Sequence, residues 1–339
     1  MKRILVVDDN IAVLKQVSAY LSDNYEVSLA KSGNLALQIC VKEEPDLVLL
    51  DIEMTDTDSF DIMSKIKRNP YLNHIPIIFL VANHSAEVEI HALEAGARDI
   101  LVKPVEKSIL LRRLELHLRF ISYQIQTEQT VMTLSDSIAT SFAEMIECRD
   151  ENIDGHVIRT AKYVDILGKE LINQGLFPDE LNPAELQMMV RAAPLHDIGK
   201  IAISDSILLK AGQLDDTEFS VMKRHSEIGA TILKRMYQRM PSQYYLRYAS
   251  LIAGSHHERY DGKGYPHGLA GDIIPLCGRI MAVADVYDAL MENRAYRSSF
   301  GHIQASNIIF DNTGTQFDPR IVEIFRKTQE QITEIANVR

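Results

Sequence analysis

The sequence lacks any apolar segment long enough to cross a lipid bilayer. A transmembrane helix needs about 18 or more consecutive apolar residues, and no stretch of the 339 residues approaches that length. At the amino terminus the apolar stretch Ile4–Val7 ends directly at Asp8 and Asp9, so it is too short for a secretory signal. We therefore expect neither a membrane segment nor a signal peptide.

Cysteine and positive charge are also scarce. The cysteines, Cys40, Cys148 and Cys277, are scattered and odd in number, which argues against a disulfide framework and predicts a cytoplasmic protein. The chain has 36 Lys and Arg against 47 Asp and Glu, a formal net charge of -11. We therefore expect no broad binding to nucleic acid, although a local cationic pocket for a phosphorylated small molecule is compatible with this balance.

The length of 339 residues predicts two domains, each able to bury its own core. Over residues 1–120, short apolar segments alternate with amphipathic ones. We predict strands at 4–7, 25–30, 47–50, 77–81 and 100–102, and helices at about 11–22, 33–43, 58–68, 85–95 and from 107 onward. Continuous Val, Ile and Leu strands separated by helices are typical of a parallel sheet covered on both faces.

Charged residues follow three of the predicted strands. Asp8 and Asp9 follow the first strand, Asp51 the third and Lys103 the fifth. In parallel α/β folds the site lies at the carboxyl ends of the strands. Converging carboxylates would repel one another unless a hard cation such as Mg²⁺ lies among them. A lysine beside them suits a phosphoryl oxygen. The alternative is that these are ordinary solvated residues at strand ends, but then four charged positions would have to coincide with the strand ends by chance.

Residues 1–120 resemble the receiver domain of two-component response regulators. The resemblance implies a flavodoxin-like α/β fold and a sensor histidine kinase that phosphorylates Asp51. It also implies a Mg²⁺ ion held by Asp8, Asp9, Asp51 and the Glu53 carbonyl, with Lys103 at the phosphoryl group.

The sequence departs from the receiver pattern at four positions. Val81 stands where the family has Thr or Ser, and it cannot donate a hydrogen bond to a phosphoryl oxygen. Ile100 replaces the usual switch aromatic, Thr55 replaces Pro, and Ser59 replaces Gly. We expect the acceptor chemistry to be retained and the usual transmission of the signal to be altered.

The stretch between Val105 and Asp154 contains no proline or glycine, which predicts one long helix or two abutting helices. Apolar residues recur every three or four positions from Leu111 to Ile146, interrupted only by Glu128 and Ser135. This spacing fits a parallel coiled coil over residues 121–147, and hence a homodimer, and it equally fits an amphipathic helix packed on its own domains. In both cases this helix is the only route by which the first domain could drive the second.

Residues 148–339 carry almost no strand signal, and we predict an all-α domain. Helical periodicity covers 156–174, 183–196, 215–239, 243–257, 276–293, 301–311 and 318–336. This half also holds seven of the chain's 11 histidines. Several of them stand beside acids, and the adjacent pair His256 and His257 suits metal ligation better than burial in a core. Asp285 is notable because an acid on an apolar helix face needs a cationic partner.

The candidate metal ligands in this half come from separate predicted helices. They are His156, His196, Asp197, His225, His256, His257 and Asp285. Each histidine alone is more often ordinary than a ligand, but together they suit a site inside a helical bundle. Seven ligands exceed the needs of one ion and would serve two ions that share a carboxylate. Mixed imidazole and carboxylate ligands favour Fe or Mn over Ca, while Zn, Co and Ni remain alternatives. A pair of such ions suits phosphodiester hydrolysis.

The combination of His196-Asp197, His256-His257 and Gly264-Tyr265-Pro266 resembles the HD-GYP subgroup of the HD phosphohydrolases over residues 148–317. The resemblance implies hydrolysis of cyclic di-GMP to pGpG and sometimes to GMP. It implies that the seven candidates are metal ligands and that Asp197 bridges two ions. It also implies that Asp197 and Lys200 are the catalytic residues.

The resemblance also implies how the substrate is held. Lys200 would meet a phosphate oxygen, and Arg294 and Arg297 would hold the other phosphate or a guanine. Tyr265 would stack on guanine or brace its loop, and bracing is the favoured interpretation. The neighbouring Glu258 is expected to be a solvated loop charge.

One departure bears on the number of ions. Asn152 stands four residues before His156, where members with three metals have glutamate. A neutral amide is a poorer ligand than a carboxylate, so we expect two metals and mainly pGpG as product. Two alternatives remain, a catalytically weak protein that binds cyclic di-GMP as a sensor and a hydrolase of a related dinucleotide such as cyclic GMP-AMP.

Overall fold

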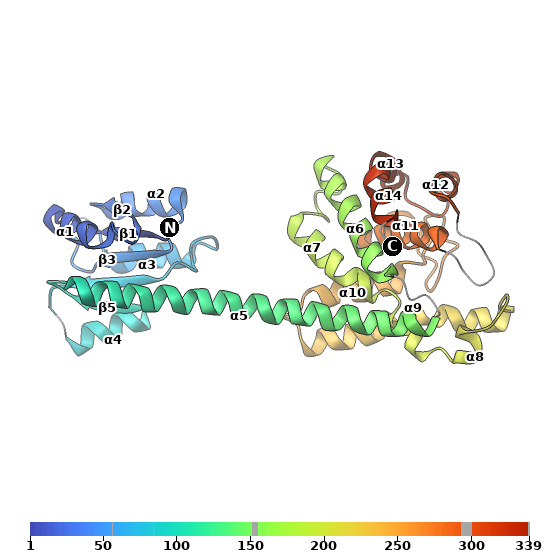
Figure 1. Ribbon diagram of the computed structural model, residues 1–339, viewed down its shortest axis with the longest axis horizontal. Helices are drawn as coiled ribbons and strands as arrows, with labels where there is room; N and C mark the ends of the chain where they lie inside the picture. Colours follow the sequence, from blue (N-terminus) through green and yellow to red (C-terminus); the bar gives the residue numbers. More distant parts are fainter. Residues whose placement is uncertain (56, 84, 151–154, 293–299, 338–339) are drawn as a thin grey trace. The chain divides into compact units, whose positions relative to one another are not determined.

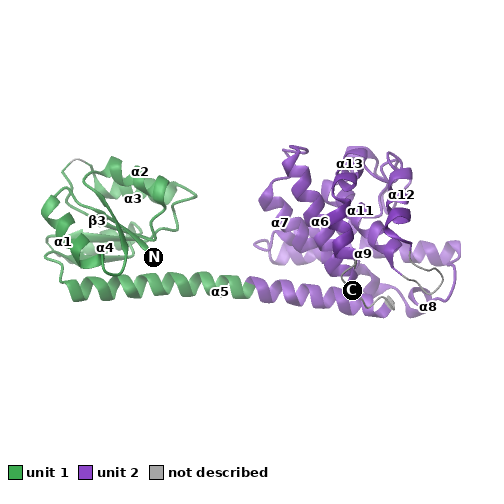
Figure 2. Cartoon of the chain, turned by 45° about the horizontal axis from the view of Figure 1, so that its top comes forward, with its two compact units in different colours: residues 1–131 green, residues 132–339 purple. Residues whose placement is uncertain are grey.

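The structure is a computed structural model. It describes residues 1–55, 57–83, 85–150, 155–292 and 300–337. The chain divides into two compact units, Met1–Val131 and Met132–Arg339 (Figure 2). The division lies inside one helix, α5 (Lys107–Glu147), so both units contain part of it.

The first unit contains the predicted parallel sheet. Its strands are β1 (Arg3–Val7), β2 (Glu26–Ala30), β3 (Leu47–Asp51), β4 (Ile77–Val81) and β5 (Asp99–Val102), in the order β2-β1-β3-β4-β5. All four strand pairs are parallel. The helices are α1 (Ile11–Leu21), α2 (Gly33–Glu43), α3 (Ser59–Arg68), α4 (Ala86–Glu94) and the start of α5 (Figure 1). The flavodoxin-like fold is confirmed.

The continuous apolar strands are explained by two cores, one on each face of the sheet. Successive side chains of a strand point to opposite faces. In β1, Leu5 and Val7 therefore join one core with α2 and α3, whereas Ile4 and Val6 join the other with α1 and α5. This double burial leaves the carboxyl ends of the strands as the place where charged side chains can gather.

Helix α5 is one helix of 41 residues, as the absence of proline and glycine allows. Near its start, Leu110, Leu114 and Leu118 enter a core of the first unit. Near its end, Ala143 belongs to the core of the second unit and Ala139 packs against it. At both ends, therefore, part of the predicted apolar spacing packs on the chain's own units.

The second unit is built from helices and short 3-10 turns. Its elements are η1 (Cys148–Asp150), α6 (His156–Asn173), α7 (Pro183–Ala192), η2 (Ala193–Leu195), η3 (Ile198–Ala202), α8 (Asp205–Leu208), α9 (Asp216–Arg239), α10 (Tyr245–Ser255), η4 (Gly271–Ile273), α11 (Leu276–Met291), α12 (His302–Asp311), α13 (Pro319–Lys327) and α14 (Gln329–Asn337). The mostly helical domain is confirmed. None of the helices in the described ranges combines the length and apolar character needed to cross a bilayer.

Two predicted helices differ from the observed ones. The helix predicted over 183–196 ends at Ala192 and continues as a 3-10 turn, because Pro194 has no amide hydrogen to extend the helical ladder. The helix predicted over 318–336 is two helices that meet at Thr328. Its backbone nitrogen donates to the carbonyls of Ile324 at 3.1 Å and Phe325 at 3.2 Å, the shared bonding that is common at the end of a helix, and its hydroxyl also donates to Ile324 at 3.0 Å.

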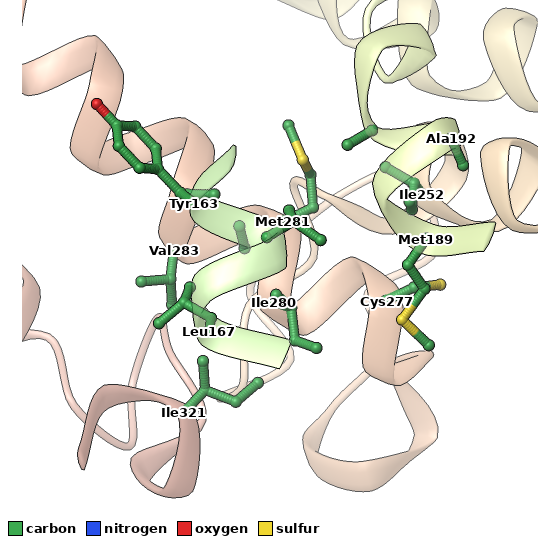
Figure 3. Close-up of a cluster of buried hydrophobic side chains, with 14 of the residues drawn as sticks. Tyr163, Leu167, Met189, Ala192, Ile252, Cys277, Ile280, Met281, Val283 and Ile321 are labelled. Atoms are coloured by element: carbon green, nitrogen blue, oxygen red, sulfur yellow. The ribbon is translucent and has the colours of Figure 1, made fainter. Parts of the chain in front are cut away.

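Helix α11 runs through the core of the second unit and is buried on almost every side. Its Ile280, Met281 and Val283 are fully buried and pack among residues of the neighbouring helices, including Leu167 of α6 and Ile321 of α13 (Figure 3). A helix that is apolar on all sides belongs in a core. Any carboxylate that α11 carries is therefore brought inside the unit.

Candidate metal centre

The predicted ligands come from five places in the second unit. His156 begins α6, His225 lies in α9 and Asp285 in α11. His196 and Asp197 lie between η2 and η3, and His256 and His257 directly follow α10. The structure brings all seven side chains together.

A glycine allows the turn that follows Asp197 to approach α9. A Cβ added to Gly199 would lie 1.9 Å from the carbonyl oxygen of His225 and 2.6 Å from the nitrogen of Gly229. No side chain fits at such distances, so this position requires glycine. The close packing of η3 on α9 sets Asp197 beside His225.

The first group of donor atoms consists of Asp197, His225, His256 and His257. One ligand atom from each residue lies within 4.8 Å of the others. Asp197 Oδ1 lies 3.1 Å from His225 Nε2 and 3.5 Å from His256 Nε2. A carboxylate among three imidazoles is a donor set suited to a transition metal.

The second group consists of Glu147, His156 and His196, whose ligand atoms again lie within 4.8 Å of one another. Asp285 Oδ1 is 3.5 Å from His156 Nε2 and 3.9 Å from His196 Nε2. Asp197 adjoins this group through its other oxygen, since Oδ2 is 3.5 Å from His196 Nε2. The two oxygens of Asp197 thus face different groups, which is the geometry that a bridging carboxylate needs.

Backbone carbonyls fix the orientation of three of the rings. Nδ1 of His196 lies 3.0 Å from the Ala193 oxygen, Nδ1 of His225 lies 2.7 Å from the Met222 oxygen, and Nδ1 of His256 lies 3.0 Å from the Ile252 oxygen. A carbonyl can only accept, so each Nδ1 carries the proton and each Nε2 presents its lone pair to the group.

The donor atoms include buried polar atoms that have no hydrogen-bond partner among the described residues. They are Nε2 of His196, Nε2 of His256 and Oδ1 of Asp197. An orphaned buried polar atom costs about 1–3 kcal/mol. Because three such atoms lie together with lone pairs that point inward, these residues fit a divalent cation.

Asp288 lies beside the candidate ligands but was not among the predicted site residues. It is 0% exposed, and its Oδ2 lies 2.7 Å from His156 Nδ1. Arg159 donates to both of its oxygens, from Nε at 2.8 Å and from Nη2 at 2.7 Å, and also to Glu292. Asp288 thus sets the ring of His156 as the carbonyls set the other rings. A signal was available, because Asp288 follows Asp285 by three residues on the same apolar helix.

Glu147 is the second missed residue. It is the last residue of α5 and is buried. Its position four residues after the buried Ala143 placed it on the inward face of the helix, which is the signal that could have found it.

Burial and neighbouring charges shift the pKa values in the group around His156. Burial lowers the pKa of His196 to about 4, so its ring is neutral at neutral pH. Burial alone would lower the pKa of His156, but the hydrogen bond to Asp288 and the charge of Glu147 outweigh it and raise that pKa to about 9. Burial raises the pKa of Glu147 to about 7, against the opposing charge of His156.

In the other group, the pKa shifts of Asp197 and His257 favour an ionised carboxylate beside a neutral imidazole, whereas burial of His256 is outweighed by the Asp197 carboxylate, which raises the pKa of His256. Burial lowers the pKa of His257 well below its ordinary value, which keeps this ring neutral. Burial would raise the pKa of Asp197, but Lys200 and the surrounding histidines outweigh it and hold the pKa well below the ordinary range. The ionised Asp197 and the neutral His257 have the protonation states that metal ligands require.

The predicted substrate residues are only partly described. Lys200 Nζ lies 2.9 Å from Asp197 Oδ2. The Tyr265 ring packs on the ring of His257, with centroids 4.7 Å apart and planes at 34°, and lies edge-on to Phe219. Arg294 and Arg297, like Asn152, lie outside the described residues.

The expectation that Glu258 is a solvated loop charge is wrong. The residue is 2% exposed, and its carboxylate accepts from the backbone nitrogens of His267 at 2.7 Å and Leu269 at 2.9 Å. A Cβ on Gly264 would lie 2.4 Å from the nitrogen of Arg259, so the loop also closes tightly on itself there. Glu258 is buried because those amides supply the partners that a carboxylate otherwise finds in water.

In the first unit, the carboxylates of Asp8, Asp9 and Asp51 have oxygens within 4.8 Å of one another. Lys103 Nζ lies 2.6 Å from Asp8 Oδ2 and 2.9 Å from Asp51 Oδ1. Burial would lower the pKa of Lys103, but its hydrogen bonds to Asp8 and Asp51 outweigh this and raise it. Three carboxylates beside one lysine suit both Mg²⁺ and a phosphoryl group.

Two departures from the receiver pattern have structural roles. Thr55 donates to Asp9 Oδ2 from its backbone nitrogen at 3.0 Å and from its hydroxyl at 2.7 Å, and this lowers the pKa of Asp9. A proline at position 55 could make neither bond. Ser59 donates its hydroxyl to the Asp51 carbonyl at 2.5 Å. Val81 is fully buried and offers no side-chain donor.

Comparison with known proteins identifies two family domains in the chain. Residues 4–115 match the response regulator receiver domain, and residues 128–321 match the HD domain. The chain is 36% identical to a probable cyclic di-GMP phosphodiesterase of Vibrio cholerae, over 98% of this chain and 79% of the relative. It is 34% identical to the cyclic di-GMP phosphodiesterase response regulator RpfG of Xanthomonas campestris, over 98% of this chain and 89% of the relative.

A further relative matches only part of the chain and has a different named substrate. The 3'3'-cGAMP-specific phosphodiesterase 2 of Vibrio cholerae is 37% identical over 59% of this chain and 36% of its own length. The matches that span both units are the ones that decide the family. The chain belongs to the response regulators in which a receiver domain is followed by an HD domain.

Proposed function

We propose that this protein is a metal-dependent phosphodiesterase that hydrolyses cyclic di-GMP, mainly to pGpG, under the control of its receiver domain. One observation carries the proposal. Two groups of imidazole and carboxylate donors adjoin through Asp197, and buried lone pairs of His196, His256 and Asp197 have no hydrogen-bond partner within the described ranges. The substrate is supported by the two relatives that share both domains.

Two divalent ions, with Fe or Mn favoured by the mixed donors, would be held by the predicted ligands. These are His156, His196, Asp197, His225, His256, His257 and Asp285. When bound, such ions supply Lewis acidity to phosphodiester oxygens and activate water. The count of two rests on the neutral side chain of Asn152.

The protein's own groups would prepare the site. The carbonyls of Ala193, Met222 and Ile252 hold three imidazole rings in fixed tautomers, so these rings would need no reorientation when the metal ions bind. Lys200, now paired with Asp197, would turn its ammonium to a phosphate oxygen and stabilise the charge that builds there. Tyr265, packed on His257, would brace the loop. Arg294 and Arg297 would hold the remaining phosphate or a guanine.

The receiver would respond to a sensor histidine kinase that phosphorylates Asp51. Mg²⁺ would bind at Asp8, Asp9, Asp51 and the Glu53 carbonyl, and Lys103 would contact the phosphoryl group. The pairing of Lys103 with Asp8 and Asp51 supports this arrangement. Signal transmission would differ from the usual one, because Val81 cannot follow the phosphoryl group with a hydrogen bond.

A homodimer through α5 is the quaternary state we propose. The helix exposes large apolar side chains that share one face, within an arc of about 100° at 3.6 residues per turn. They are Leu116, Phe120, Tyr123, Val131, Leu134, Ile138, Phe142 and Met145, all at least half exposed or close to it. An uncovered apolar stripe of this length suits a second copy of the same helix. Light scattering of a Leu134→Glu, Ile138→Glu variant should report a monomer where the parent protein is a dimer.

The decisive experiment for the enzyme measures turnover of cyclic di-GMP by protein loaded with Fe or Mn. A His196→Ala, Asp197→Ala variant is the control, and we expect it to be inactive. Equal rates for the two proteins would overturn the enzyme assignment, and tight binding without turnover would favour the sensor. A parallel assay with cyclic GMP-AMP tests the alternative substrate that the third relative suggests.

A further inference from the structure

We propose that Glu147, the last residue of helix α5, is an eighth ligand of the metal centre and binds the ion on the His156 side. The inference rests on the proposed function, since it assumes that the cluster holds divalent metal. It concerns a residue that neither the motifs nor the relatives single out.

The position of the Glu147 carboxylate relative to His156 carries the argument. Glu147 Oε1 lies 3.5 Å from Nε2 of His156, whereas Asp288 occupies the opposite nitrogen, Nδ1, at 2.7 Å. Glu147 thus faces the nitrogen that is directed toward the cluster. Its ligand atom also lies within 4.8 Å of those of His156 and His196.

A simple ion pair does not account for this arrangement. Glu147 and Asp285 each approach Nε2 of His156 at 3.5 Å, and one ring nitrogen can serve only one of them well. Both distances exceed the roughly 2.7–3.2 Å of an N–H···O hydrogen bond. Nε2 of His196, which is 0% exposed, has no hydrogen-bond partner in the described part of the chain. Donors that surround a common space without bonding one another are typical of a cation site.

Burial and charge favour the same conclusion. The side chain of Glu147 is 9% exposed, and that of Asp285 is 15% exposed. Two nearly buried carboxylates that face the same imidazole repel each other, and a divalent cation between them removes that cost. With Asp197, His156, His196 and Asp285, Glu147 would give this ion five protein ligands.

The backbone that follows Glu147 is anchored to the segment that carries Lys200. Arg149, in η1, donates to the carbonyls of Lys200 at 3.4 Å and Ile203 at 3.2 Å, and to Asp205 Oδ1 at 2.6 Å. The end of α5 is therefore held against η3 on one side while Glu147 enters the cluster on the other. A ligand needs a fixed backbone of this kind.

The test measures metal content and affinity, not turnover. Wild type, Glu147→Gln and the control Glu144→Gln are equilibrated with buffered Mn²⁺ and then analysed for bound metal per chain. Glu144 lies on the same turn of α5, but its carboxylate is not one of the clustered ligand atoms. We expect Glu147→Gln to bind one ion at least tenfold more weakly, as other losses around metal sites do, and Glu144→Gln to match wild type.

Thermal unfolding with and without metal separates a ligand from a structural residue. A ligand contributes to the rise in Tm that metal produces, so this rise should shrink in Glu147→Gln. An unchanged rise, together with a lower Tm of the metal-free variant, would overturn the inference. Glu147→Asp keeps the charge on a shorter side chain and should restore part of the affinity. If wild type itself bound no divalent metal, the proposed function would fall and the ligand role with it. If wild type bound divalent metal and Glu147→Gln bound it equally well, the ligand role alone would fall and the proposed function would stand.

Discussion

His156 Nδ1 lies 2.7 Å from Asp288 Oδ2, and the same aspartate receives two hydrogen bonds from Arg159. The contact joins the first residue of α6 to a residue of α11 that lies 132 positions later. Because Asp288 and Arg159 are both buried, the ion pair and the orientation of His156 depend on each other. Substitution of Asp288 should therefore affect stability and metal binding together.

We expect Asp288→Asn to weaken metal binding by about 10–100-fold, because the amide no longer fixes the charge and orientation of the His156 ring. The free energy of unfolding should fall by about 3 kcal/mol, since Arg159 loses a buried anionic partner. Metal titration and urea denaturation measure the two effects. The control is Asp311→Asn, at an exposed position in the same unit. Unchanged metal affinity in Asp288→Asn would contradict a supporting role.

The stability of the metal-free protein should fall as pH rises from about 6.5 to about 9. His156 faces Glu147, Asp285 and Asp288, and its pKa is raised to about 9, so folding is favoured while the ring is protonated. This contribution is complete below the unfolded pKa of about 6.5 and is lost as pH rises through the folded value, for a total of about 3 kcal/mol.

The same series with metal present should show no such loss, because a bound ion requires the deprotonated ring. Urea denaturation at several pH values, with and without Mn²⁺, measures the difference. Parallel pH profiles for the metal-free and metal-bound protein would mean that metal does not displace the proton of His156.

Lys200→Ala should lower kcat for cyclic di-GMP by about 100-fold while the metal content stays the same. Among the described residues, Lys200 is the cation nearest to the shared carboxylate, with its ammonium 2.9 Å from Asp197 Oδ2. We expect this ammonium to stabilise a phosphate oxygen of the substrate. The control, Lys210→Ala, removes a cation that pairs with Glu218 at the start of α9. Loss of bound metal in Lys200→Ala would show instead that the lysine supports the centre.

Asp51→Asn should abolish uptake of a phosphoryl group from a small-molecule phosphodonor. The acceptor carboxylate, its lysine and the two neighbouring acids are all in place. Intact-mass spectrometry measures the modification, and Asp61→Asn is the control because it removes only an exposed pair with Lys65. If the Asp51→Asn protein and its parent stayed equally unmodified, the first unit would be a receiver in fold alone.

The receiver fold could be predicted closely from the sequence because its signal is local. Strands such as Ile77–Val81 are apolar throughout, since the sheet is covered on both faces. The acids that follow the strands need no tertiary knowledge to be placed at one edge of the sheet. The seven candidate ligands could be proposed for a similar reason, since adjacent pairs such as His256 and His257 are conspicuous in the chain.

The residues that were missed depend on contacts that no local pattern reveals. In the sequence Asp288 is one acid among many, and only its contacts with Arg159 and His156 distinguish it. Glu258 looks like a loop charge because the amides that bury it come from His267 and Leu269, well along the same loop. The break at Thr328 is equally hidden, since the apolar spacing continues across it and only the local backbone conformation changes there.

The course of α5 has a practical consequence for anyone who wishes to separate or exchange the two domains. A fragment that begins at residue 148 would leave Glu147 behind. It would also lose Asp136, to which Arg191 donates from Nε at 2.9 Å and from Nη2 at 2.7 Å. A self-sufficient output module therefore has to begin upstream of Asp136. Chimaeras with other receivers should be joined within the first half of the helix, and their linkers should preserve its register.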